Sequence, residues 1–259
     1  MFATVQSLSL FTLFALFFAA LVGASELGHR LGARAARRGA PAREAGTIAT
    51  AAFALLALLV AFTYSMAVAR YDMRRAVVLD EADALRDAAR LAPLLPDDDG
   101  PALVNDLRRM RDLALGLGIP YDPARFDADV AETAAVSDRL WAHLGAAVAA
   151  QPNSLPATRM SDALTRLDDA VERRTTALRN HVPMAVYGLL AGTAAVAMAF
   201  AGHAAGAAEA NRRASAAVMA ALLSAVVSVT LDLQRPDRGM VEVPLTPLRD
   251  IGGVLPPLP

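Results

Sequence analysis

The sequence contains neither cysteine nor lysine, and only 5% of its 259 residues are aromatic. Without cysteine the chain can form no disulfide bond, no thiolate metal site and no cysteine nucleophile. The absence of lysine beside abundant alanine is typical of a GC-rich bacterial genome, so arginine usage alone indicates no mechanism. A formal net charge of -1 gives no reason to expect a nucleic-acid partner.

The motifs of common enzyme classes are missing as well. The sequence has no G-x-S-x-G, no P-loop and no H-E-x-x-H, and its four histidines are scattered. His29 and His203 lack further ligands at metal-site spacing. The acidic run at 97–99 lacks the twelve-residue loop of a calcium site. We therefore expect no enzyme, no cofactor and no metal site.

Long apolar segments are what the sequence has in quantity. It is 55% hydrophobic with a mean hydropathy of +0.37, and its charges are concentrated between the apolar segments. Four segments are long enough to cross about 30 Å of hydrocarbon at 1.5 Å per residue. They run approximately from Phe2 to Ala24, Thr47 to Val68, Met184 to Gly202 and Ala214 to Leu231. The sequence thus predicts a multi-pass protein of the plasma (inner) membrane, with the lipid bilayer as its surroundings.

The spacing of these segments predicts an all-α fold of two membrane hairpins with an extramembrane helical bundle between the second and third membrane helices. No glycine or proline occurs from Thr47 to Leu91, which predicts one helix that continues out of the bilayer. Further helices are expected over about 101–117, 123–150 and 161–179. The predicted parts are a first membrane helix with a basic connector (1–46), a second membrane helix (47–69), the bundle (70–182), the last two membrane helices (183–232) and a proline-rich tail (233–259).

The arginines near the membrane ends do not decide the orientation. The two short connectors carry seven and the opposite side eleven. This excess would place the bundle and both termini in the cytoplasm, but long loops count little under the positive-inside rule. The uncharged N-terminal segment followed by five arginines favours the other orientation for the first helix.

Small and hydroxyl-bearing residues recur at spacings of three and four along the second membrane helix. Such a face suits a pore lining, with a nearby apolar side chain as a constriction that gates by dewetting. Close packing between helices explains the same small residues equally well. The pore-lining candidates are Thr50, Ala54, Ala57, Ala61, Phe62, Ser65 and Met66. Ser224 and Ser228 could likewise line a pathway, although interhelical hydrogen bonds are the expected use.

The stretch LDLQRPDRG, residues 231–239, follows the last apolar run directly. Pro236 ends the helix and Gly239 permits a turn. An unpaired carboxylate at the lipid boundary is costly, so we expect Asp232 to pair with Arg74, Arg75 or Arg179.

The two arginines of this stretch, Arg235 and Arg238, could pair with Asp72, Asp80 or Glu81. These contacts would form a clasp that holds the tail against the bundle. The alternative is a ring of charge at a pore mouth. The tail that follows carries five prolines in nineteen residues and is expected to be extended.

Three blocks of sequence carry a resemblance to a known family. Residues 47–85, 165–191 and 227–250, in this order and at these distances, resemble the bacterial bestrophin-like membrane proteins. The third block is the most specific, because an apolar helix ending in Asp-Leu-x-Arg-Pro-x-x-Gly before a proline-containing coda is an unusual string.

A more distant similarity connects the chain with the bestrophins, which are pentameric anion channels. It implies a homo-oligomer, a pore lined by the second membrane helix, and a cytosolic bundle with cytosolic termini. A membrane scaffold or sensor whose bundle binds a partner is the alternative function. The resemblance implies anions as the permeant ions, although the predicted lipid spans contain no arginine that would select them.

Overall fold

The computed structural model describes residues 9–38, 43–95, 99–117, 122–180, 182–208, 210, 212–233 and 241–255. Within these ranges the chain is helical and no residue lies in a strand. The predicted all-α class is therefore confirmed. The chain divides into a membrane unit, residues 1–69 and 182–235, and a bundle unit, residues 70–181 and 236–259.

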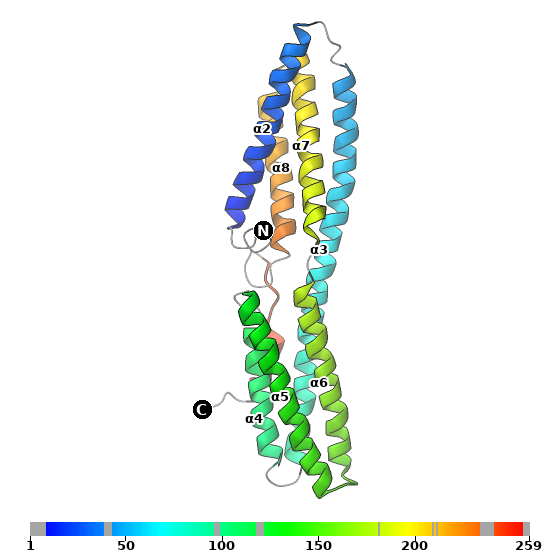
Figure 1. The fold of residues 1–259 in the computed structure, drawn as a ribbon, viewed down its shortest axis with the longest axis vertical. Helices are drawn as coiled ribbons and strands as arrows, with labels where there is room; N and C mark the ends of the chain where they lie inside the picture. Colours follow the sequence, from blue (N-terminus) through cyan, green and yellow to red (C-terminus); the bar gives the residue numbers. More distant parts are fainter. Residues whose placement is uncertain are drawn as a thin grey trace. The chain divides into compact units, whose positions relative to one another are not determined.

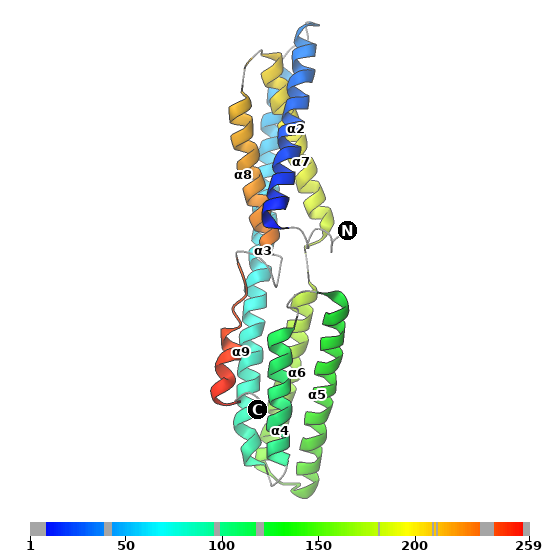
Figure 2. The same ribbon diagram turned by 90° about the vertical axis from the view of Figure 1, so that its left-hand side faces the viewer.

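The membrane unit contains four helices that are long and apolar enough to cross a bilayer. They are α2 (Leu10–Ala36), the first part of α3 (Arg43–Leu91), α7 (Met184–Ala207) and α8 (Arg213–Asp232), and they run side by side in Figures 1 and 2. The structure thus confirms four apolar helices. The bounds of the first helix differ from the prediction, because the described helix begins at Leu10 and continues to Ala36 instead of ending near Ala24.

The core of the membrane unit joins all four helices. Leu21 of α2, Leu56 of α3, Met198 of α7 and Ala220 of α8 are each at most 2% exposed and belong to one cluster. Elsewhere the apolar side chains of these helices point outward, as the 80% exposure of Phe11 illustrates. Outward apolar side chains are expected for helices whose surroundings are lipid or further subunits.

The bundle unit contains the second part of α3, the 3-10 turn Ala92–Leu94, α4 (Asp99–Gly116), α5 (Pro123–Ala150) and α6 (Leu155–Arg179). Asp122 accepts a hydrogen bond from the Ala124 amide at 3.0 Å and so caps α5. Ser154 caps α6 through the Ala157 amide at 3.4 Å. Because Ser154 supplies this cap, α6 begins six residues before the predicted Ser161.

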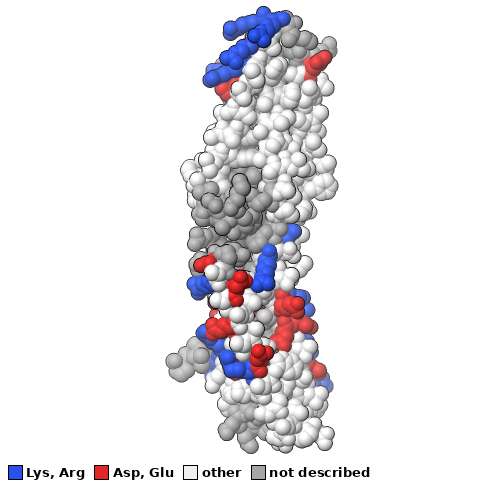
Figure 3. All heavy atoms as spheres, viewed as in Figure 1, with Lys and Arg blue, Asp and Glu red and all other residues white. Residues whose placement is uncertain are grey.

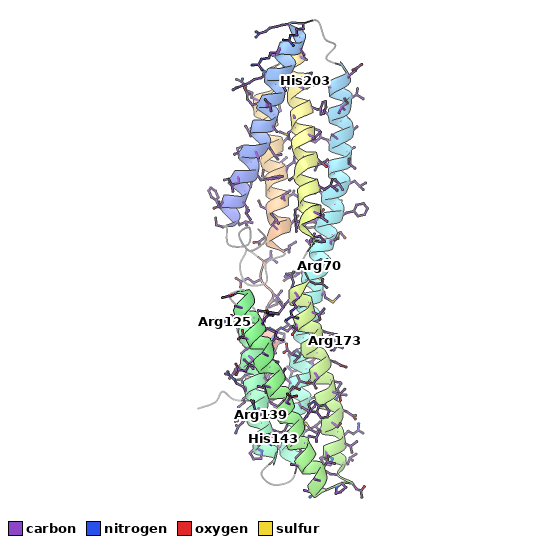
Figure 4. The ribbon with its side chains drawn as sticks, in the orientation of Figure 1. Arg70, Arg125, Arg139, His143, Arg173 and His203 are labelled. Atoms are coloured by element: carbon purple, nitrogen blue, oxygen red, sulfur yellow. The ribbon has the colours of Figure 1, made fainter. Side chains whose placement is uncertain are left out.

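Leucine and methionine at helical spacing form the core of the bundle. Leu85, Leu107, Leu140 and Leu164, one from each helix, are at most 1% exposed. Polar contacts connect α4 to α5 at the surface, where Arg139 Nε donates to Asp106 Oδ1 at 2.9 Å (Figure 4). The predicted helical bundle is therefore a packed domain with its own apolar interior.

The C-terminal tail packs on the bundle instead of remaining extended. It forms α9 (Thr246–Asp250) and a 3-10 turn (Ile251–Gly253), and α9 contacts α4. Figure 2 shows α9 in red within the bundle unit. Leu248, Ile251 and Leu255 are fully buried in the bundle core. Their spacing of three and four residues is a helical signal that the surrounding prolines obscured. The expectation of an extended tail was thus wrong for residues 246–253.

Candidate functional site

The pore-lining candidates all lie on the exposed face of α3. Thr50, Ala54, Ala57, Ala61, Phe62, Ser65 and Met66 are each classed as exposed. The opposite face of the same helix is buried through Leu56, Thr63 and Ala67, at 2%, 3% and 0% exposure. The seven candidates therefore do not pack closely against other helices of this chain, and close packing against a helix of another subunit stays the alternative to a pore lining.

Polar groups are sparse on this face. The hydroxyl of Thr50 donates to the Gly46 carbonyl oxygen at 3.0 Å, one turn earlier in the same helix. Its oxygen is left as an acceptor toward the exposed side. Residues 47–69 include no ionisable side chain other than Tyr64. Selectivity among ions would have to come from dipoles along the helix or from charges beyond its membrane-spanning part.

Several bulky side chains lie among the small residues on the exposed side of α3, namely Leu55, Leu58, Phe62, Tyr64 and Met66. Phe62 is 62% exposed and Met66 is 39% exposed, and they lie one turn apart on α3. Where such side chains from several subunits converge, they make a narrow apolar ring from which water is easily expelled. The hydrophobic constriction itself stays a prediction.

The residues of the predicted clasp are described only in part. Asp232, at 1% exposure, is buried at the end of α8, and Arg74, at 3%, is buried in the second part of α3. Asp72 and Arg75 are exposed. The remaining members, Arg235, Pro236, Arg238 and Gly239, lie outside the described residues. The clasp stays a prediction.

Two side chains proposed for the clasp have other partners. Arg174 Nη1 of α6 donates to Glu81 Oε2 at 2.5 Å, and both side chains are only 3% exposed. Arg174 Nη2 also donates to the Ala114 carbonyl oxygen at 2.6 Å. Arg179 Nη2 lies 3.0 Å from Asp127 Oδ1 on α5. Glu81, one of three acidic residues considered for the tail arginines, therefore pairs with Arg174 within the bundle.

Hydroxyl groups on α8 bond within their own helix. Ser224 is fully buried, and its hydroxyl donates to the Ala220 carbonyl oxygen at 2.7 Å. The expectation that Ser224 bonds across helices was wrong, because the carbonyl one turn earlier is already within reach of a serine in a helix. Ser228 is also buried, at 5% exposure, and so faces the interior of the membrane unit. Neither serine is exposed to a pathway outside the chain.

A pair of glycine motifs brings α2 and α7 into backbone contact. A Cβ atom on Gly28 would lie 1.9 Å from the Ala199 carbonyl oxygen, and one on Gly202 would lie 2.0 Å from the Ser25 carbonyl oxygen. The same relation repeats one turn further, at Gly32 and Gly206, with 2.1 Å in each case. Each helix therefore contributes one G-x-x-x-G motif to a reciprocal contact. We name these four residues the glycine contact.

Inspection of the sequence for G-x-x-x-G within apolar segments would have found the glycine contact. Both motifs lie toward the connector ends of their helices, and in the sequence His29 follows Gly28 and His203 follows Gly202. Figure 4 labels His203. Among the described residues, no group of three or more histidine and acidic side chains could hold a metal ion. The histidines therefore accompany a packing motif.

The four membrane helices and the inserted bundle define the class of protein as a multi-pass helical membrane protein. Comparison with known proteins then gives the family. A family model described as a Bestrophin-like domain matches residues 15–248, so the chain belongs to the Bestrophin-like family. No protein with curated annotation matches the sequence significantly.

Solved structures show the same fold at low sequence identity. A mutant of the bacterial bestrophin homologue from Klebsiella pneumoniae is 15% identical, with a TM-score of 0.72, and the match covers 94% of this chain and 99% of that one. A structure of this homologue phased with zinc is 16% identical, with a TM-score of 0.68 and coverage of 97% and 100%. The predicted resemblance is confirmed, and it extends over nearly the whole chain.

Proposed function

We propose that the protein is an oligomeric ion channel whose pore is lined by the outward face of α3 between Thr50 and Met66. The observation that carries this proposal is the division of α3 into two faces. One face packs against its own chain through Leu56 and Thr63. The other presents a stripe of small and hydroxyl-bearing residues outward, flanked by the exposed side chains of Leu55 and Leu58. A homo-oligomer with closed symmetry would bring copies of that face together around an axis.

The composition of this face favours a pore over contact with lipid alone. Ala54, Ala57, Ala61 and Ser65 leave room next to the helix backbone, whereas a face that only contacts acyl chains has no need of small residues or hydroxyls. Phe62 and Met66 would provide the constriction. The family resemblance implies a pentamer and anions as the permeant ions, and both are part of the proposal.

Current measurements across a planar bilayer test the channel. A protein-dependent current under a KCl gradient is expected, with a reversal potential near that of chloride. A reversal potential near that of potassium would overturn the anion assignment but retain the channel. Absence of current from folded, inserted protein would contradict the channel and favour a non-conducting scaffold or sensor.

Single introduced cysteines test the pore lining, since the chain has no cysteine of its own. In Ala57→Cys, a charged thiol reagent is expected to lower the current at least severalfold, because the added group would stand in the ion path. Val218→Cys on α8, 59% exposed, is the matched control and should conduct unchanged after treatment. Equal responses of the two variants would contradict a pore lined by α3.

A further inference from the structure

An open hollow lies among the four helices of the membrane unit, and of its wall only Thr50 and Gly202 belong to the pore-lining candidates or the glycine contact described above. Its volume is about 710 Å³. We name it the interhelical pocket. Residues that represent its wall are Val22 and Glu26 of α2, Thr50 and Phe53 of α3, Met198 of α7 and Arg212, which directly precedes α8.

The wall of the interhelical pocket changes from apolar to polar along the helices. On α2 the wall begins with Val22 and ends with Glu26 and His29 toward the first connector. On the α8 side it begins with Met219 and ends with Arg212 beside the second connector. Seven residues of helix at 1.5 Å per residue span about 10 Å along the helix axis. The pocket therefore extends from the polar connector end of these helices into their apolar part.

The polar end of the pocket carries excess positive charge. Arg213 Nε lies 3.2 Å from Glu26 Oε2, and Arg30 Nε lies 3.1 Å from Glu26 Oε1. One carboxylate is thus shared by two guanidinium groups. Arg212 has no ion-pair partner within the ranges that the structure describes. Figure 3 shows basic side chains gathered at this end of α2 and an almost uncharged surface along the helices.

We propose that the interhelical pocket binds an anionic glycerophospholipid of the surrounding bilayer. Arg212 and Arg213 would receive the phosphate, because guanidinium groups match phosphate oxygens in charge and geometry. The apolar wall at Val22, Phe53 and Met198 would receive the first part of an acyl chain. A soluble phosphate would leave that apolar wall exposed, whereas a lipid satisfies both ends and is present at high local concentration. This proposal does not depend on ion conduction.

Native mass spectrometry of the purified full-length protein tests the site, with phosphatidylglycerol and phosphatidylcholine of equal chain length as probes. We expect wild type to retain phosphatidylglycerol in preference to phosphatidylcholine. Arg212→Gln should reduce the affinity for phosphatidylglycerol about fivefold, the effect of removing one interfacial cation. Ala205→Trp, which fills the pocket without changing charge, should reduce the retention of both lipids.

Arg37→Gln is the matched control, because Arg37 lies in the same basic region but outside the pocket wall. Its affinity for phosphatidylglycerol is expected to equal that of wild type. Equal losses in Arg37→Gln and Arg212→Gln would overturn the proposal in favour of diffuse electrostatic attraction. A wild type without lipid preference would overturn it, and so would an Ala205→Trp variant that changes subunit number but not lipid retention, since a second copy of the chain would then occupy the pocket.

Discussion

Buried charges are the residue-scale feature that most constrains this protein. Glu81 and Arg174 are both 3% exposed and pair with each other, and Arg174 also donates to a backbone carbonyl oxygen. Breaking such a pair leaves a charge in a low-dielectric interior and costs about 3 to 5 kcal/mol. This arrangement fixes α3 against α6 within the bundle. The same physical rule applies to Asp232 at the end of α8.

Asp232→Asn tests whether Asp232 has a structural or an electrostatic role. If Asp232 forms a buried ion pair, as the clasp prediction states, the substitution should lower the free energy of unfolding by about 3 kcal/mol. Thermal unfolding in detergent measures this change. If Asp232 belongs to a charge ring at a pore mouth, ion flux should change at unaltered stability.

Asp83→Asn is the matched control for this experiment, because Asp83 forms a surface ion pair with Arg86 and its side chain is 57% exposed. Pairs of this kind contribute about 0 to 1 kcal/mol. Equal stability and equal flux of wild type and Asp232→Asn would contradict both roles of Asp232.

At the scale of elements, the glycine contact explains why α2 and α7 pack more closely than any other described pair. Interfaces between membrane helices gain little from the hydrophobic effect, so they depend on close approach of backbones. Gly28 and Gly202 permit this approach because neither has a Cβ atom. The contact is therefore sensitive to the smallest possible substitution.

Gly28→Ala is expected to destabilise the membrane unit, because its Cβ would lie 1.9 Å from the Ala199 carbonyl oxygen. Overpacking of this kind costs about 1 to 3 kcal/mol or forces the helices apart. Gly23→Ala on the same helix meets nothing within 4 Å and is the matched control. The control should be neutral or slightly stabilising, because alanine has the higher helix propensity. Equal melting temperatures of the two variants in detergent would refute the importance of the contact.

The sequence predicted these elements well wherever periodicity and length were informative. The apolar runs predicted all four membrane helices, and the lack of glycine and proline after Thr47 predicted that α3 is continuous. The start of α6 was placed too late, because the cap at Ser154 was not considered. Packing partners were harder to predict. The pairing of Glu81 with Arg174 depends on how two helices about 90 residues apart are aligned against each other. Local sequence patterns do not predict this alignment.

At the scale of the whole molecule, orientation in the membrane is the principal proposal. We propose that the bundle and the termini lie in the cytoplasm, as the family resemblance implies. The connectors, which carry Arg30, Arg34, Arg212 and Arg213, would then face the opposite side. This distribution departs from a simple positive-inside arrangement, so the orientation needs a direct measurement.

Cysteine labelling in spheroplasts provides that measurement. Asp138→Cys places a thiol on the exposed surface of α5, and Ala214→Cys places one at the connector end of α8. An impermeant maleimide is expected to label Ala214→Cys at once and Asp138→Cys only after lysis. The reverse pattern would place the bundle outside the cytoplasm. Labelling of the cysteine-free wild type gives the background.

The two helices of the glycine contact are synthesised at very different times. Gly28 and Gly202 are separated by about 170 residues, including the entire bundle apart from its tail. At about 5 to 20 residues per second, a ribosome needs about 10 to 35 s to synthesise this interval. During that time α2 has left the ribosome, but α7, the helix that packs against its glycines, has not yet been synthesised. Early insertion of α2 is thus followed by a long delay, in which α4, α5 and α6 can begin to fold, whereas the tail residues that complete the bundle core are synthesised after α8.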